Sequence, residues 1–351
     1  MAFNSGTISI GDATEKTDYD RLMDNTVFNK AQTISEISRI QSGTVSFEGP
    51  KTFQSATALN GEISIDGTVY KPTVFGILGL VGAGLNVPGI VVVALAAMDS
   101  THVAFIDDTQ EDLRTYVWSG SAWSLDGNEL HIAGIGNPAL AALDSTHVAF
   151  IDWTVEELTT YVWSGTTWSK DGNALGIAGI GGLALAALDS THIAFIDTTI
   201  AELTTYVWDG TDWTKVGNGL AIAGGIASPA LAALDSTHIA FIDAVVEELT
   251  TYVWDGTDWT KVGTALSIAD SVAPALCTLD SEHIGYIDTI NEELRTYYWD
   301  GNTWIEVGAG LAIAGLGYVA LAAIDGNNIV FIDQTIHELR TYKAVKILQI
   351  E

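Results

Sequence analysis

A 45-residue internal repeat is the feature that most constrains how this chain of 351 residues can fold. The string LDSTH or a close variant recurs six times, with spacings of 45, 45, 46, 45 and 45 residues between its aspartates. These aspartates are Asp99, Asp144, Asp189, Asp235, Asp280 and Asp325. Repeats of this length indicate a modular architecture, in which each unit packs against its neighbours. The chain is therefore expected to contain six copies of one supersecondary unit.

The third copy shows how one unit is built. An apolar run (LALAAL) is followed by the turn DST and by a second apolar run, HIAFID. A polar loop then leads to ELTTYVW, where apolar and polar side chains alternate, and the pair Asp209-Gly210 marks a tight turn before a fourth run begins at Trp213. Four short strands per unit without helical periodicity predict an all-β fold. A period of about 45 residues with four strands is typical of one blade of a β-propeller.

The two ends of the repeat region complete each other. The sixth copy stops after LRTYKAV and lacks its Trp-x-Gly-x-x-Trp turn and its fourth strand. In the register of the repeat Leu85 matches Leu175, so the missing strand lies ahead of the first copy. We therefore predict that residues 78–88 form the outer strand of a blade whose other three strands come from residues 319–348. This pairing closes a six-bladed β-propeller with four strands per blade and removes exposed strand edges.

Charge and composition exclude several classes of function. The chain carries 44 acidic and 14 basic residues, a net charge of −30, so nucleic-acid phosphates and anionic lipid would repel it. Hydrophobic residues make up 48% of the chain, which excludes a disordered acidic tail. The single cysteine, Cys277, excludes an internal disulfide and a thiolate metal cluster. The apolar segment 76–97 is long enough to span a membrane, but the repeat register assigns it to two strands, so no membrane insertion is expected.

Catalytic motifs are absent from the sequence. It contains no Gly-x-Ser-x-Gly, no His-Glu-x-x-His and no glycine-rich phosphate loop, and the turn DGTDW is one residue shorter than the sialidase box SxDxGxxW. We therefore expect a protein that is not an enzyme and needs no cofactor. Aspartates such as Asp107 and Asp152 end the second strand of each copy; weak Ca²⁺ binding is the alternative to turn capping by these carboxylates. Histidines such as His147 are expected to bond the turn aspartates, not a shared metal.

The copies differ mainly in one set of connections. The turns between strands 1 and 2 and between strands 3 and 4 are nearly invariant, whereas the loops between strands 2 and 3 and between blades vary. We expect ligand binding on the variable face, with Trp153 and Tyr318 as candidate binding residues; incidental exposure is the alternative for Trp153. The ten tryptophans that follow the repeat are predicted to pack between blades, with sugar stacking as the alternative.

Three arginines occupy one repeat position. Arg114, Arg295 and Arg340 stand where the other three copies carry threonine. Their copies, the first, fifth and sixth, become neighbours when the ring closes, so these arginines are candidate ligands for a carboxylate or a sialic acid. The opposing interpretation is that equivalent positions on separate blades point apart.

Residues 1–75 differ from the repeat region. They carry 9 acidic and 6 basic residues, so residues 76–351 hold −30 − (6 − 9) = −27 of the net charge. The amino terminus lacks the basic and apolar regions of a secretion signal. Residues 12–40 fit two short helices, and the following residues alternate between glycines as short strands do. This helix-plus-β-hairpin region is too short to bury a core alone, so oligomerisation or docking on an assembly is expected.

Two segments resemble parts of known virion proteins. The opening SGTISIGDATEKTDYDRLMDNTVFNKA resembles the start of many tailed-bacteriophage fibre and appendage proteins, and FEGPKTFQSATALNGEISIDG is similar to their glycine-punctuated β-shaft, which is usually trimeric. The repeat LAALDSTHIAFID…ELTTYVWDGTDWTKVGNGLAI resembles propeller-like repeats of phage and bacterial surface proteins. The resemblance implies a virion structural protein assembled in the host cytoplasm. Residues 1–75 would anchor it to other virion proteins and form a homotrimer, with residues 76–351 as the distal propeller.

Three functions follow from these observations. The leading prediction is a phage fibre or spike whose propeller binds a host-surface receptor or glycan through repeated shallow sites. The first alternative is a structural part without an adsorption role, such as a capsid decoration, collar or tail protein. The second alternative is a free multivalent lectin.

Overall fold

The structure is a computed structural model that describes residues 46–47, 63–65, 68–223, 226–268, 271–287 and 290–350, with side chains described between residues 79 and 344. Every regular element within these ranges is a β-strand. Contacts divide the chain into one compact unit of residues 77–344 and a second of residues 1–76 with 345–351. The helices predicted over residues 12–40 lie outside the described residues.

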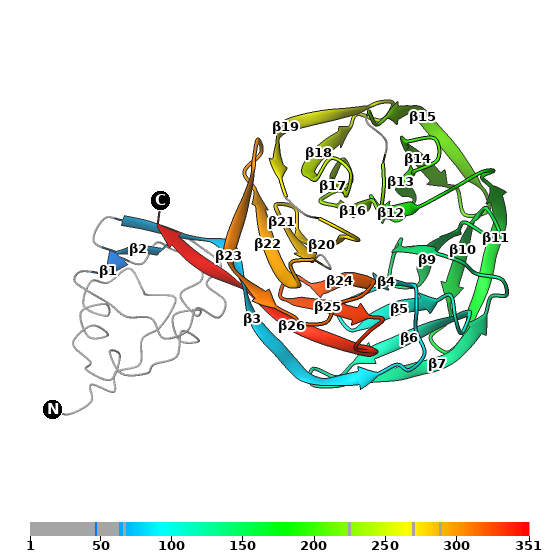
Figure 1. The fold of residues 1–351 in the computed structure, drawn as a ribbon, viewed down its shortest axis with the longest axis horizontal. Coiled ribbons are helices and arrows are strands. Elements are labelled where there is room, and N and C mark those ends of the chain that lie inside the picture. Colours follow the sequence, from blue (N-terminus) through cyan, green and yellow to red (C-terminus); the bar gives the residue numbers. More distant parts are fainter. Residues whose placement is uncertain are drawn as a thin grey trace, which may run out of the picture. The chain divides into compact units, whose positions relative to one another are not determined.

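The larger unit is a ring of six blades around a central axis (Figure 1), which confirms the predicted β-propeller. Blade 1 contains β4 (Val93–Ala97), β5 (His102–Asp107), β6 (Asp112–Trp118) and β7 (Trp123–His131). Blade 2 contains β8 (Pro138–Ala142), β9 (His147–Asp152), β10 (Glu157–Trp163) and β11 (Trp168–Gly176). Blade 3 contains β12 (Leu183–Ala187), β13 (His192–Asp197), β14 (Glu202–Trp208) and β15 (Trp213–Ala221).

The remaining contiguous blades repeat this plan. Blade 4 contains β16 (Ala230–Ala233), β17 (His238–Asp243), β18 (Glu248–Trp254) and β19 (Trp259–Ser267). Blade 5 contains β20 (Ala275–Asp280), β21 (His283–Ile287), β22 (Glu293–Trp299) and β23 (Trp304–Ala312). In all five blades, consecutive strands pair antiparallel, from the innermost strand to the outermost.

Blade 6 is assembled from both ends of the repeat region. Its sheet has the order β1 (Ser46–Phe47), β2 (Ile63–Ile65), β3 (Thr68–Asn86), β26 (Glu338–Ile350), β25 (Asn328–Asp333) and β24 (Val319–Asp325). The prediction that residues 78–88 supply the outer strand beside residues 319–348 is confirmed, and β3 starts earlier, at Thr68. The segment 76–97 forms the end of β3 and all of β4, as the repeat register predicted. No helix among the described residues has the length and apolar character to cross a membrane.

The core lies between blades because each sheet is covered on both sides. One apolar cluster joins Ile106 and Leu113 of blade 1 to Phe150 and Trp168 of blade 2, and similar clusters lie between the blade pairs 6 and 1, 2 and 3, 3 and 4, and 4 and 5. The second strand of each blade is buried almost along its whole length, which is why its sequence, HIAFID or a variant, reads as a continuous apolar run. Neighbouring blades therefore stabilise one another, as a repeat architecture requires.

The repeated tryptophans also join neighbouring blades by hydrogen bonds. In five blades, the indole Nε1 of the outer strand donates to a buried threonine hydroxyl of the preceding blade. The pairs are Trp123–Thr341, Trp168–Thr115, Trp213–Thr160, Trp259–Thr205 and Trp304–Thr251, at 2.8–2.9 Å. At the sixth interface the sequence has Leu78 in place of the tryptophan, and Thr296 of blade 5 donates to the carbonyl of Val307 in its own blade. The prediction that these tryptophans pack between blades is confirmed.

The repeated aspartates cap turns on both faces of the ring. Asp144 Oδ1 accepts hydrogen bonds from the backbone amides of Thr146 and His147 at 2.7 and 2.8 Å, and Asp144 Oδ2 lies 3.0 Å from His147 Nδ1. At the other face, Asp152 Oδ1 accepts from the amides of Thr154 and Val155. The predicted turn bonding of the histidines and turn capping by the second-strand aspartates are thus confirmed; the equivalent Asp288 lies outside the described residues.

Candidate functional site

The variable connections form one face of the ring, which we call the loop face. It consists of the loops between the second and third strands and the connections between blades. In the described part of the chain, nine of the twelve large hydrophobic side chains that are exposed lie in these loops: Val91, Trp153, Val155, Ile200, Val245, Val246, Val272, Ile290 and Tyr318. Monomeric proteins rarely gather exposed apolar side chains on one surface without a binding role. The loop face is therefore the candidate binding surface.

The two aromatic candidates lie on this face but in different blades. Trp153 is 47% exposed in the second-to-third-strand loop of blade 2, and Tyr318 is 55% exposed in the connection from blade 5 to blade 6. The indole of Trp153 lies so close to Gly136 that a β-carbon there would be 2.9 Å from its Nε1. The glycine in the connection from blade 1 thus makes room for the tryptophan.

The structure shows a groove in the loop face between blades 3 and 4, which we call groove 4 after the blade that supplies its third strand; the equivalent residue positions of the other blades are numbered as grooves 1, 2, 3, 5 and 6 in the same way. Groove 4 encloses about 380 Å³ between blades 3 and 4. Its lining comes from the end of β15 and the following connection (Leu220, Ala221, Ile222, Ala223), and from blade 4 (Phe241, Asp243, Val246, Glu248, Thr250, Tyr252, Lys261). This volume is at the lower end of the range typical of small-molecule sites, about 300–1,000 Å³.

Polar groups in groove 4 keep unused hydrogen-bonding capacity. Lys261 Nζ lies 3.6 Å from Glu248 Oε2, too far for a strong hydrogen bond, and the lysine side chain is 47% exposed. Asp243 is 1% exposed; its Oδ1 accepts from the amides of Val245 and Ala227, whereas its Oδ2 is buried without a hydrogen-bond partner. A buried acceptor without a donor costs free energy, so this oxygen favours a ligand that brings a donor.

Tyr252 supplies a neutral phenol in groove 4. Burial raises its pKa, and the carboxylates of Glu248 and Asp243 raise it further, because they disfavour a second negative charge nearby. The ring packs edge-on against Phe241, with centroids 6.1 Å apart. The groove thus combines an aromatic wall with a hydroxyl, a carboxylate pair and an ammonium group.

The same set of groups recurs around the ring. Every blade begins its third strand with an acidic residue and carries a tyrosine four residues later. The tyrosines are Tyr116, Tyr161, Tyr206, Tyr252, Tyr297 and Tyr342. Of the eight basic residues in residues 76–351, six stand at groove positions, one per blade: Arg114, Lys170, Lys215, Lys261, Arg295 and Arg340. In a region of charge −27, this placement of almost all the cations marks the grooves as the chemically distinctive part of the surface.

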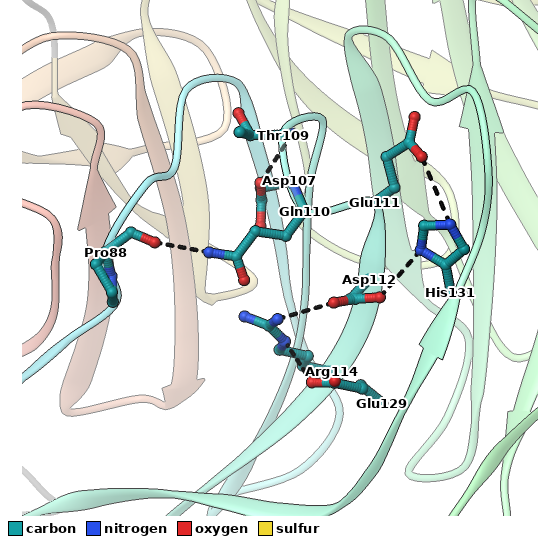
Figure 2. A network of polar contacts seen from close by, with 9 residues as sticks. All are labelled: Pro88, Asp107, Thr109, Gln110, Glu111, Asp112, Arg114, Glu129 and His131. Atoms are coloured by element: carbon teal, nitrogen blue, oxygen red, sulfur yellow. Dashed lines mark hydrogen bonds and ion pairs between the residues drawn. The ribbon is translucent and has the colours of Figure 1, made fainter.

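Groove 1 shows the arginine version of this arrangement (Figure 2). Arg114 Nη2 donates to Asp112 Oδ2 at 2.9 Å, and its Nε donates to Glu129 Oε2 at 3.1 Å. Burial alone would lower the pKa of Arg114, but the tyrosine hydroxyl of the same strand and these carboxylates reverse the effect and raise it. His131 Nδ1 lies 3.3 Å from Asp112 Oδ1, so Asp112 is shared between two partners.

Gln110 links the second-to-third-strand loop of blade 1 to the connection from blade 6. Its Nε2 donates to the carbonyl of Pro88 in the connection from blade 6, at 2.6 Å (Figure 2). Asp107 Oδ2 is buried there without a hydrogen-bond partner. Burial raises the pKa of Asp107, against hydrogen bonds from the amides of Gln110 and Thr109 and the charge of Arg114, which act to lower it.

The other two arginines are also held by their own blades. Arg295 donates through Nε and Nη2 to Glu293 Oε2, at 3.0 and 2.8 Å, and Arg340 Nε donates to Glu338 Oε2 at 2.8 Å. The three arginines lie in grooves 1, 5 and 6, one in each, so the structure does not bring them together around one ligand. No group of three or more His, Cys, Asp or Glu side chains in the described part of the chain could hold a metal ion.

Sequence reasoning missed the three lysines. Lys170, Lys215 and Lys261 pair across the sheet with the groove tyrosines of their blades. A signal was present in the sequence: the copies with a threonine at the arginine position are the same three that carry a lysine two residues after the second tryptophan. This exchange of one cation for another indicates that each groove keeps a positive charge beside its acidic residue.

Comparisons with known proteins agree with the fold. No protein-family model matches the chain, and no curated protein matches it. Among solved structures, the SapL1 lectin in complex with α-methyl fucoside is similar, with 16% identity, a TM-score of 0.54, and 76% of this chain and 96% of that chain covered. The Aleuria aurantia lectin in complex with α-methyl-L-fucoside is similar at 15% identity, a TM-score of 0.52, and 76% and 96% coverage.

A third similar structure is a protein of unknown function from Bacteroides thetaiotaomicron, with 14% identity, a TM-score of 0.54, and 83% of this chain and 84% of that chain covered. At these identities the likeness establishes the propeller fold alone. Any ligand of this chain has to be argued from its own residues.

Proposed function

We propose that the propeller is a multivalent carbohydrate-binding domain whose sites are the grooves between blades on the loop face. The observation that carries the proposal is groove 4. A cavity of about 380 Å³ presents a buried carboxylate oxygen without a donor, a loosely paired ammonium group and a phenol beside an aromatic ring. Saccharides offer the matching groups, since adjacent hydroxyls both donate and accept while the ring C–H face packs on aromatic side chains.

Repetition supports the proposal. Each blade carries an equivalent set of groove residues, and weak binding at several such sites would be raised by orders of magnitude on a multivalent surface. The fold comparisons favour the lectin alternative over a purely architectural role, because two of the similar propellers are described as lectins in complex with a fucoside. The proposed function is a binding activity.

The setting in which the propeller acts is a separate proposal. The resemblance of residues 1–75 to phage fibre starts supports a virion appendage, with host-surface glycan as the target, and mass spectrometry of purified particles tests it. Detection of the chain in particles would favour the appendage over a free lectin. A search that finds it only in culture supernatant would reverse that preference.

The binding proposal is tested with the full chain on a glycan array and on a whole-cell panel. We expect saturable binding to neutral glycans, with stronger retention on densely than on sparsely coated surfaces. The control variant is Ile305→Ala, which alters an exposed side chain of β23 away from the loops and is expected to bind as the unmodified chain does. Absence of binding to every glycan by a folded protein would refute the proposal.

A further inference from the structure

The six grooves fall into two chemical classes, and their difference bears on which of them binds. Grooves 2, 3 and 4 have a threonine on the third strand and a lysine on the outer strand; grooves 1, 5 and 6 have an arginine on the third strand and leucine or glutamate on the outer strand. We propose that the three lysine grooves are the saccharide sites and that they take neutral sugars, while the arginine grooves are filled by their own ion pairs. The inference rests on the proposed carbohydrate binding.

The cations differ in how fully they are engaged. The arginine side chains are 14%, 25% and 24% exposed and hydrogen-bond carboxylates of their own blades at 2.8–3.1 Å. Lys215 and Lys261 are 46% and 47% exposed, and their ammonium groups lie 3.8 and 3.6 Å from Glu202 and Glu248. An ammonium at that separation can turn toward a ligand oxygen at little cost, because an exposed ion pair contributes little stability.

Threonine makes the space that arginine occupies. Thr250 is buried in the wall of the groove 4 cavity, where the long side chain of an arginine would extend into the groove. In groove 1 that position is Arg114, which spans from Asp112 on β6 to Glu129 on β7. Gln110 adds a further bridge to Pro88 in the connection from blade 6, at the loop position where groove 4 has Val246. The arginine version therefore engages its cation within the protein, while Asp107 Oδ2 in groove 1 stays without a hydrogen-bond partner.

The charges in the grooves favour a neutral ligand. Groove 4 contains Lys261 with Glu248 and Asp243, a formal sum of 1 − 2 = −1. Groove 1 contains Arg114 with Asp107, Asp112 and Glu129, a sum of 1 − 3 = −2. A sialic or uronic acid would bring a further negative charge into a protein of net charge −30, and like charges in contact are strongly selected against.

The buried oxygen of Asp243 adds a contact in groove 4 but does not distinguish the two classes, because Asp107 Oδ2 in groove 1 also lacks a partner and Asp152 Oδ2 in groove 2 accepts from Gly136. The Oδ1 atom is already committed to the loop, so Oδ2 is the one that a sugar hydroxyl would meet. Lys261 on the outer strand of the same blade would donate to a second hydroxyl, and the apolar side chains of Ile222 and Val246 would contact the ring. A pair of neighbouring hydroxyls beside an apolar patch is the chemical feature that groove 4 selects.

The experiment counts sites on the full chain. Titration calorimetry and native mass spectrometry would use methyl α-L-fucoside, methyl β-D-galactoside and methyl α-D-mannoside, with 3′-sialyllactose as the anionic probe. The best neutral probe is expected to fill three sites, one for each lysine groove, and the anionic probe to bind at least about tenfold more weakly.

Three variants test which grooves bind. Thr250→Arg with Lys261→Leu gives groove 4 the arginine and the leucine of groove 1, and the count should fall from three to two. Asp243→Asn preserves the loop acceptor and removes only the second carboxylate oxygen; it should weaken one site by about tenfold or more. Arg114→Thr is the matched control in an arginine groove, with no expected change in the count.

The outcomes separate this inference from the function on which it rests. Six sites in the unmodified chain, or a count that falls with Arg114→Thr and not with the groove 4 variants, would overturn the inference while leaving carbohydrate binding intact. No binding of any probe by the folded chain would overturn both. Circular dichroism and thermal unfolding of each variant establish that the number of binding sites is measured on folded protein. If the double variant does not fold, the affinity of the Asp243→Asn variant decides whether groove 4 is a binding site.

Discussion

The hydrogen bonds between neighbouring blades allow a quantitative test of how the ring is held together. Trp168 Nε1 donates to Thr115 Oγ1 at 2.9 Å, and the two residues are 5% and 0% exposed. Replacement of Thr115 by valine leaves the buried indole N–H without an acceptor, which costs about 1–3 kcal/mol of unfolding free energy. Trp168→Phe leaves the threonine hydroxyl unpaired in the same way and adds the cost of a cavity where the larger ring was.

The double variant separates these contributions. When both partners are removed, neither polar group remains buried without a partner, so the combined loss of unfolding free energy should be smaller than the sum of the single losses by about 1–3 kcal/mol. The measurement is urea unfolding of the full chain and its three variants, followed by tryptophan fluorescence and circular dichroism. Coincident transitions by the two probes are required before the free energies are compared.

A control pair uses the interface that lacks a tryptophan. Thr296 donates to the carbonyl of Val307 within blade 5, and Trp168 belongs to blade 2, so Thr296→Val and Trp168→Phe are expected to act independently. Their effects should add within about 0.5 kcal/mol. A coupling below about 0.5 kcal/mol for Trp168 and Thr115, or an equally large coupling in the control pair, would refute the assignment of these bonds as local ties between blades.

Four further outcomes are expected. Gly172→Ala should prevent stable folding, because the glycine has φ +63° and an added β-carbon would overlap a backbone carbonyl of the next blade. Gly210→Ala is the milder variant: the glycine has φ +95° and nothing lies within 4 Å of the added β-carbon, so the loss of unfolding free energy in urea should be about 1–2 kcal/mol. Burial raises the pKa of Cys277 to about 12, so a thiol reagent should label it only after unfolding. Burial acts to raise the pKa of Asp144, but hydrogen bonds from its turn outweigh this effect and lower the pKa. The stability that the Asp144 carboxylate contributes is therefore present above pH 3.8 and is lost as the pH falls through the pKa of the folded protein. Asp144→Asn should accordingly destabilise the protein at pH 7 but not at about pH 2. Burial, and to a smaller extent the charge of Glu157, raise the pKa of Tyr161 to about 12. The ultraviolet titration of this phenol should therefore be complete only above pH 12, and the stability that Tyr161 contributes below pH 10 should be lost as the pH rises toward 12.

The repeat made the fold predictable because a strand or turn that is clear in one copy identifies the equivalent residues of the other copies. The outer strand of blade 6 has no Trp-x-Gly-x-x-Trp turn, and only the match of Leu85 to Leu175 identified it as a strand of the propeller. The turn aspartates and the packing tryptophans were predictable for the same reason: a residue that recurs in nearly every copy meets a need of the blade itself.

The candidate site was harder to predict because it depends on differences between copies. The sequence made Arg114, Arg295 and Arg340 candidates for one shared binding site, yet each arginine hydrogen-bonds a carboxylate within its own blade. Each of these carboxylates stands two residues before its arginine, on the same face of the strand, so the sequence did contain this signal. The further bond of Arg114 to Glu129 was hidden, because the bulge in the pairing of the third and outer strands decides which outer-strand residue faces the arginine. The buried oxygen of Asp243 was equally hidden, since an aspartate that caps a turn gives no sign in the sequence of whether its second oxygen is satisfied.

The three blades that carry an arginine are neighbours around the ring. Blades 5, 6 and 1 surround the junction where β3, from one end of the repeat region, joins β26 from the other. A β-carbon at Gly84 of β3 would lie 3.3 Å from Arg340 Cγ and 2.6 Å from Glu338 Oε2, so this ion pair packs directly on the joining strand. In blade 1, Arg114 likewise links β6 to Glu129 on the outer strand. Connectivity therefore accounts for the arginine of blade 6 alone, because only that blade takes its outer strand from another part of the chain; in the contiguous blades 1 and 5 the arginine bonds an acidic residue of its own third strand.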